Sequence, residues 1–365
     1  MESKGSDMAD KRDIIVIGGG IIGASIAWHL VNAGARVRLI AGKTGGVATP
    51  TSFAWINASW GNPEAYFRLR TRSMAEWRRL AGDVPDLQPA WIGGLCWDLP
   101  REALDAYARE HGRWGYRIRK VDGAEAARIE PNLLRVPDFA LHVPEEGAIE
   151  PRMAAVTLIE HARSQGLELL EGVSAIGLAE DAGRLIGVKT ADGLMSADMV
   201  VLAAGAETPA LARSVGVTVP VDAPPGLIVH SKPAAKMLNG LVLAAELHLR
   251  QTAEGRIIAG SDFAGTDPGT EPERAARELF DKVRAFLRNG AALEMDFHTV
   301  GYRPTPRDGF PILGEATDLE GLYLAVTHSG ITLAPAIGRF AADEILTGNR
   351  EPLLAPYRLS RFDAA

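Results

Sequence analysis

The feature that most constrains this chain is a glycine pattern close to its N-terminus. Residues 14–17 (IIVI) form a short apolar run, Gly18, Gly20 and Gly23 follow with the spacing GxGxxG, and 24–33 has the composition of a helix. Gly18 permits a tight turn, Gly20 lets the backbone approach a phosphate, and Gly23 lets the helix pack on the strand. The helix N-terminus then points at the phosphate charge. The sequence therefore predicts a Rossmann-type dinucleotide site.

Length, charge and cysteine content limit the class of protein. A chain of 365 residues favours two connected domains. The net charge of −7 argues against nucleic acid or an anionic membrane as the main partner. Cys96 is the single cysteine, which rules out an internal disulfide and favours a reducing, cytoplasmic location. The apolar run 14–31 contains four glycines and His29, and no basic segment precedes it. We therefore expect neither a membrane span nor a signal peptide, and a flexible leader over 1–12.

The second predicted strand, 35–40, lacks the acidic residue that usually ends such a strand and binds the adenosine ribose. Ala41 occupies that position, and no acidic residue occurs between Asp13 and Glu64. The hydroxyls of Thr44 or Thr49 are possible substitutes. Lys43 and Arg38 are basic residues that could bind the 2′-phosphate of NADP. The alternative is that Lys43 is simply a solvent-exposed lysine without a ligand.

Strand-like and helix-like segments alternate along the rest of the chain, as in α/β proteins. Helical spacing occurs at 64–80, 101–115, 151–166, 271–289 and 331–346. Strand patterns occur at 91–99, 117–121, 167–170, 173–179, 197–206, 227–230, 241–249, 256–260 and 322–326. Turn signals at 182–184 and 191–193 predict a small meander of short strands.

A second strand-to-helix junction lies at 327–332 (THSGIT). Its helix N-terminus offers the backbone N–H groups of Gly330, Ile331 and Thr332 to an electron-rich ligand. A flavin gains negative charge near its N1 and O2 atoms on reduction, so such a helix end favours the reduced form. An ordinary turn capped by Ser329 or Thr332 is the alternative.

Several motifs appear in a characteristic order. They are the N-terminal glycine pattern, 52–56 (SFAWI), 202–205 (LAAG), 301–304 (GYRP) with 308–311 (DGFP), and 328–330 (HSG) with the helix after it. Together they resemble the D-amino-acid oxidase family, which includes glycine oxidase, sarcosine oxidase and related FAD-dependent amino-acid dehydrogenases. The resemblance spans about residues 13–350.

The resemblance implies an α/β fold with two domains. A glutathione-reductase-like Rossmann domain that binds FAD is expected from 13–85, 145–220 and 305–365. A substrate domain with a mixed, largely antiparallel sheet is expected from 86–144 and 221–304. The implied cofactor-binding residues are Gly18, Gly20, Ile22, Gly23, Thr51, Ser52, Ala175, Ala204, Gly205, Gly330, Ile331 and Thr332. Monomeric sarcosine oxidases attach flavin through a cysteine late in the chain, where this chain has none, so non-covalent FAD is expected.

Four residues are candidates for the catalytic site. Arg303 matches the family arginine that binds the substrate carboxylate, and a guanidinium suits that task because it makes two parallel bonds. A buried structural ion pair is the alternative for Arg303, and packing is the alternative for its neighbour Tyr302. His328 lies in the loop expected at the flavin, and His248 alternates with leucines on a strand that faces the substrate. No histidine pair has metal-ligand spacing, so no metal is expected.

The expected reaction is oxidation of the C–N bond of an amino acid or N-substituted amino acid. Hydride passes from the α-carbon to flavin N5, and the imine then hydrolyses to an oxo acid. One alternative is a flavin-bearing subunit of a multi-subunit amino-acid, opine or hydroxyproline dehydrogenase. A second is an NAD(P)-dependent dehydrogenase. The substrate side chain, its stereochemistry, the electron acceptor and the oligomeric state stay open.

Overall fold

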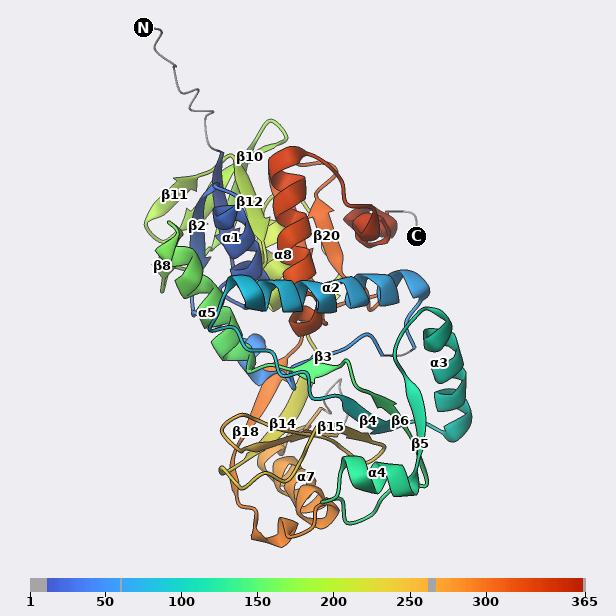
Figure 1. Ribbon diagram of the computed structural model, residues 1–365. Coiled ribbons are helices and arrows are strands. Elements are labelled where there is room, and N and C mark those ends of the chain that lie inside the picture. Colours follow the sequence, from blue (N-terminus) through green and yellow to red (C-terminus); the bar gives the residue numbers. More distant parts are fainter. Residues whose placement is uncertain (1–11, 60, 262–266, 364–365) are drawn as a thin grey trace, which may run out of the picture.

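A computed structural model describes residues 12–59, 61–261 and 267–363. Two large sheets dominate the structure, one in each half of the molecule, and the long helix α2 (Glu64–Asp83) runs between them (Figure 1). Residues 1–11 of the expected leader lie outside the described part. Arg12 is tied to the fold, because its Nη1 donates to Ile345 O at 2.8 Å.

The first sheet has six strands and is parallel except at one edge, where β20 is antiparallel. In spatial order its strands are β20 (Ile312–Glu315), β21 (Leu322–Val326), β12 (Met199–Leu202), β1 (Asp13–Ile17), β2 (Arg36–Ala41) and β8 (Glu168–Glu171). The central strand β1 is buried on both faces: Ile14 and Val16 join a core with the helices, and Ile15 and Ile17 join a core on the opposite face. This explains the continuous apolar run in the sequence.

Helices cover one face of this sheet, and a small sheet covers the other. The helices on the first face include α1 (Ile21–Asn32), α5 (Pro151–Ser164) and α8 (Gly330–Thr347), which pack side by side (Figure 1). The opposite face carries α6 (Thr208–Arg213) and the three-stranded meander of β9 (Gly177–Asp181), β10 (Arg184–Thr190) and β11 (Gly193–Ser196). The meander predicted from the turn signals is confirmed.

The second sheet has eight strands and is antiparallel except for one parallel pair, β15 with β4. In spatial order its strands are β18 (Met295–Tyr302), β14 (Pro225–Ser231), β17 (Ile257–Gly260), β16 (His248–Gln251), β15 (Leu241–Ala244), β4 (Gly94–Trp97), β6 (Phe139–Val143) and β5 (Arg119–Asp122). The remaining elements are α3 (Arg101–Arg113), α4 (Gly123–Ile129), α7 (Pro272–Phe286) and the two-strand pairs β3 (Trp55–Ile56) with β7 (Gly147–Ala148) and β13 (Val221–Asp222) with β19 (Thr305–Pro306). The mixed, largely antiparallel sheet is as predicted.

Strands of the first sheet come from 13–41, 168–202 and 312–326, and strands of the second from 94–143 and 225–302. The boundaries of the two domains given above remain a prediction. Among the residues that the structure describes, no helix has the length and apolar character needed to cross a bilayer.

Two element predictions were wrong in detail. The run 241–249 is two strands, because a turn bond from Ala244 N to Leu247 O reverses the chain between them. The helix predicted over 271–289 ends at Phe286, where Leu287 becomes extended and Asn289 adopts a left-handed backbone with φ +60°.

Helix α2 holds α8 through a contact that depends on a proline. Pro335 lies inside α8 and has no N–H for the carbonyl of Ile331, four residues earlier. The indole Nε1 of the buried Trp77 donates to that carbonyl at 2.9 Å. The carbonyl freed by the proline is therefore satisfied from the neighbouring helix.

This contact predicts an energetic coupling between Trp77 and Pro335. Trp77→Phe leaves the buried Ile331 carbonyl without a donor, which costs about 1–3 kcal/mol of the free energy of unfolding. In a Pro335→Ala background the restored N–H can satisfy that carbonyl, so the same change costs less. Urea unfolding of the four proteins in the double-mutant cycle measures the difference. Equal costs in both backgrounds would contradict the coupling.

Candidate active site

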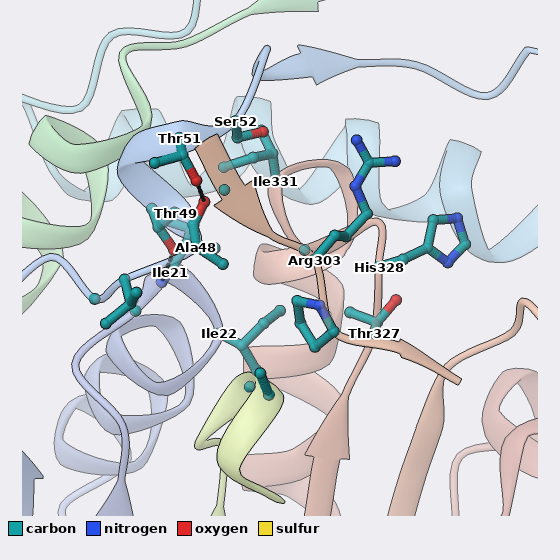
Figure 2. A pocket seen from close by; sticks show the side chains of 18 of the residues that line it. Ile21, Ile22, Ala48, Thr49, Thr51, Ser52, Arg303, Thr327, His328 and Ile331 are labelled. Atoms are coloured by element: carbon teal, nitrogen blue, oxygen red, sulfur yellow. Dashed lines mark hydrogen bonds between the residues drawn. The ribbon is translucent and has the colours of Figure 1, made fainter. Parts of the chain in front are cut away.

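A cavity of about 930 Å³ lies between the two large sheets. Its wall includes the ends of β1, β2 and β12, the 42–55 segment, the N-terminus of α8, and residues of β14, β17 and β18. The side chains of Ile21 and Thr49 lie on one side of this cavity, and Arg303 and His328 on the other (Figure 2). Ligands of open α/β sheets bind beyond the carboxyl ends of parallel strands, which is where this cavity begins.

The glycine turn leaves room for a phosphate that side chains would fill. A Cβ on Gly20 would lie 3.2 Å from Thr49 Oγ1, and Gly46, across the turn, has no room for a Cβ beside the Gly20 backbone. Gly20 is the N-cap of α1 and offers no side-chain cap, so backbone N–H groups of the first turn remain for a ligand. Gly18 has φ +121°, which the tight turn requires. The turn therefore fits a dinucleotide pyrophosphate.

Gly23 differs from the other two glycines of the motif, because it does not line the cavity. A Cβ there would lie 1.9 Å from Gly18 O, so Gly23 permits the close contact between α1 and the turn. Its role in cofactor binding is indirect.

The region expected to hold adenosine carries no acidic side chain from β2. Ala41 is buried, and Gly42, Lys43 and Ser174 line the cavity near it. Thr49 Oγ1 accepts a bond from Ile21 N at 3.1 Å and thereby supports the glycine turn, and Thr49 also lines the cavity. Thr44 is not among the lining residues.

The N-terminus of α8 forms the opposite end of the cavity. Ser329 is its N-cap, and neither predicted cap is made: Ser329 makes no capping bond, and Thr332 Oγ1 donates to Trp55 O at 3.1 Å. Gly330, Ile331 and Thr332 all line the cavity. The uncapped N–H groups and the helix dipole favour negative charge at this end.

Most of the predicted site residues meet at this cavity. Those that line it are Gly18, Gly20, Ile22, Thr51, Ser52, Ala175, Ala204, Gly205, Tyr302, Arg303, His328, Gly330, Ile331 and Thr332. The side chains of Arg303 and His328 lie side by side (Figure 2). Tyr302 lies at the cavity edge and is 55% exposed.

His328 is buried in a way that keeps it neutral. Burial, and after it the charges of Arg70 and Arg303, lower the pKa of His328 to about 3. Its Nε2 lies 3.0 Å from Ser329 Oγ. An imidazole with this pKa is too weak a base to take a proton near neutral pH, so it serves as a neutral hydrogen-bonding group.

His248 does not line the cavity. It is buried, its Nε2 lies 3.6 Å from Asp98 Oδ2, and its ring lies 6.3 Å from that of Phe53. Asp98 and Phe53 are themselves lining residues, so His248 lies behind the cavity wall. The alternation with leucines correctly indicated a strand, and the catalytic role of His248 stays a prediction.

Sequence reasoning missed Arg70, a buried residue of α2 that lines the cavity. A signal was present: Arg70 lies three residues after Phe67, four before Met74 and seven before Trp77, so it shares the apolar face of the helix. A single arginine on such a face indicates a buried partner or ligand.

A buried carboxyl group, also missed, supports the wall beside Arg70. Glu146 accepts bonds from Trp55 Nε1 at 2.9 Å, from Tyr116 OH at 2.5 Å and from Ser59 Oγ. Burial raises the pKa of Glu146 to about 7. Because Trp55 and Ser59 line the cavity, Glu146 fixes the segment between them. Within the described ranges, no group of three or more His, Cys, Asp or Glu side chains is arranged to hold a metal ion.

The parallel sheet, the glycine turn and the second helix N-terminus at one cavity define a dinucleotide-dependent oxidoreductase. The family model described as FAD dependent oxidoreductase (DAO) matches residues 13–344, so the chain belongs to this family. The cofactor is therefore FAD, and the NAD(P)-dependent alternative is wrong.

Relatives extend over almost the whole chain. Glycine oxidase from Pseudomonas aeruginosa is 30% identical, with 94% of this chain and 96% of the relative covered. Glycine oxidase from Bacillus licheniformis is 27% identical, with 93% and 94% covered. Among solved structures, the L-proline dehydrogenase from P. horikoshii is 25% identical with a TM-score of 0.86, covering 97% of this chain and 98% of its own.

The space at Gly20 predicts the effect of adding a side chain there. Gly20→Val places methyl groups where the phosphate approaches, while the fold needs only a small shift at Thr49 Oγ1. We expect a folded protein with little bound flavin, measured by the ratio of flavin to protein absorbance. Gly82→Ala, at an uncrowded helical glycine, is the matched control and keeps its flavin. Normal flavin content in Gly20→Val would contradict the assignment of the turn.

The neutrality of His328 gives a pH prediction. The pKa of His328 lies near 3 instead of 6.5, so the imidazole is almost entirely unprotonated between pH 5 and 8. Its titration therefore cannot cause kcat/KM to rise or fall with pH in that range. His328→Gln should lower the rate without changing the apparent pKa values of that profile. If a rise or fall of kcat/KM between pH 5 and 8 disappeared in His328→Gln, His328 would titrate in this range, which would contradict the prediction.

Proposed function

We propose that this protein uses FAD to oxidise the C–N bond of an amino acid or N-substituted amino acid whose carboxylate is held by Arg303. Membership of the FAD-dependent oxidoreductase family supports the class of reaction, and relatives named glycine oxidase support an amino-acid substrate. The observation that carries the proposal is the position of Arg303. It lines the same cavity as the N-terminus of α8, beside His328 and opposite the glycine turn (Figure 2).

The chain's own residues bind and orient, and the cofactor supplies the redox chemistry. When bound, FAD would supply the acceptor for the hydride that leaves the substrate α-carbon, and the residues around the cavity would hold the two in place. The Arg303 guanidinium makes two parallel bonds to the carboxylate, which fixes the α-carbon as well as increasing affinity. The substrate leaves as an imine, which water hydrolyses to an oxo acid and ammonia, or to the free amine where the nitrogen is substituted.

The amine must be neutral before it loses hydride, because an ammonium group has no lone pair to stabilise the developing imine. The pKa of His328, near 3, prevents it from holding that proton at neutral pH. We therefore propose that the neutral amine is the reacting form of the substrate.

We propose that FAD is bound without a covalent link through cysteine. Cys96 is buried in β4, its thiol donates to Asp98 Oδ1 at 2.9 Å, and burial raises its pKa well above the usual range. It is not among the lining residues of the cavity. We also retain the cytoplasmic location, which the single cysteine supports.

The role of Arg303 predicts a specific kinetic change. Arg303→Lys and Arg303→Ala should raise KM for the best amino-acid substrate by about tenfold or more, since a bidentate charged contact is worth about 1.5–3 kcal/mol. Bound flavin should be retained. Arg307→Ala, at an exposed position of the same segment, is the control and should behave as the unaltered protein.

An unchanged KM in both Arg303 variants would remove Arg303 from the substrate site. The flavin-subunit alternative makes a different prediction. In that case the isolated protein shows no reduction of its flavin by any amino acid, and activity appears only when a partner subunit is added.

A further inference from the structure

Arg70 links two separate parts of the cavity wall. Its Nε and Nη2 donate to the backbone O and the Oδ1 of Asn57, at 3.0 and 2.6 Å. Its Nη1 donates to Ser329 Oγ at 2.8 Å. Asn57 follows β3, and Ser329 is the N-cap of α8, so one guanidinium joins the 55–59 segment to the helix N-terminus.

This guanidinium is a buried positive charge. Arg70 is 6% exposed, and among the described residues it forms no ion pair within 4.0 Å. The buried carboxyl group of Glu146 is near enough for the Arg70 charge to lower its pKa, but burial outweighs this effect and raises the pKa of Glu146 to about 7, so Glu146 is only partly ionised near neutral pH. Its other near neighbour is the ring of Tyr66, whose centroid lies 5.3 Å from the guanidinium carbon. The three bonds above use three of the five N–H donors of an arginine. Burying a cation without a fully ionised partner costs free energy, and a ligand that supplies negative charge would lower that cost.

We propose that Arg70 is a positioning residue that also supplies the positive charge for the pyrimidine ring of the flavin. The inference rests on the proposed function and on the expectation that the flavin lies against Gly330, Ile331 and Thr332. The N-terminus of α8 already carries a partial positive charge, and Arg70 adds a full charge hydrogen-bonded to its first residue. Negative charge develops near flavin N1 and O2 on reduction, so Arg70 favours the reduced cofactor.

The hydrogen bonds around Ser329 extend this effect to His328. Ser329 Oγ accepts from Arg70 Nη1 and lies 3.0 Å from His328 Nε2, so one hydroxyl connects the guanidinium to the imidazole. The Arg70 charge also helps to lower the pKa of His328, so the imidazole stays uncharged and Arg70 has no protonated histidine beside it.

The test compares the flavin midpoint potential of the holoprotein with that of Arg70→Met, Arg70→Lys and Arg68→Met. Arg70→Met removes the charge, Arg70→Lys keeps it with fewer hydrogen bonds, and Arg68→Met removes an exposed arginine two residues away on the same helix. We expect the equilibrium constant for flavin reduction to fall about tenfold in Arg70→Met, which is about 30 mV for a two-electron couple. Arg70→Lys should lose less, and Arg68→Met nothing. Arg70→Gln, which keeps a side-chain donor, replaces Arg70→Met if the latter does not retain flavin.

Three results would overturn the inference. Equal potentials in all four proteins would show that the charge does not act on the flavin, and equal losses in the Met and Lys variants would show a purely structural role. A rise in KM with an unchanged potential would also overturn it, by assigning Arg70 to the substrate carboxylate. These results are distinguishable from failure of the proposed oxidation, which would appear as an unaltered protein whose flavin is not reduced by amino acids.

Discussion

The site depends on the parallel pairing of β1 between β2 and β12, with β21 beside β12. Because these strands run in one direction, their carboxyl ends reach the same edge of the sheet, and the helices that follow β1 and β21 begin there. The N-termini of α1 and α8 are about 300 residues apart in sequence and face one cavity. The N-terminus of α1 suits the pyrophosphate of the cofactor, and the N-terminus of α8 suits the electron-rich flavin ring. The pairing of the strands therefore sets the distance between these two positively polarised ends of the cavity.

The second constraint is the support of α8, whose first turn forms the functional end of the cavity. Trp77 satisfies the carbonyl that Pro335 leaves free, and Ser25 of α1 donates to Ala334 O at 2.8 Å. Arg70 and Thr332 tie the same turn to the 55–59 segment. Trp77 thus replaces the one internal bond that Pro335 removes, and the other contacts hold the N-terminus of α8 in place without a side-chain cap.

Features set by local sequence were predictable, and features set by tertiary packing were not. The glycine turn, the meander and the 327–332 junction follow from strand, turn and helix signals within a few residues, and the structure has all three. Gly23 has the packing role that the motif predicts, whereas the bond from Ile21 N to Thr49 Oγ1 was not predicted, because it depends on how the 42–55 segment packs against the glycine turn. Arg70 and Glu146 became recognisable only when α2 and the 55–59 segment were brought together. The apolar spacing around Arg70 was the one local signal for it.

The most direct test of the central claim is anaerobic mixing of the purified holoprotein with D-, L- and N-alkyl amino acids while the flavin absorbance is followed. The account predicts that at least one of these compounds bleaches the flavin, and that the matching amine without a carboxylate does so far less well. A flavin that is bleached by dithionite but by none of the amino acids would contradict the account.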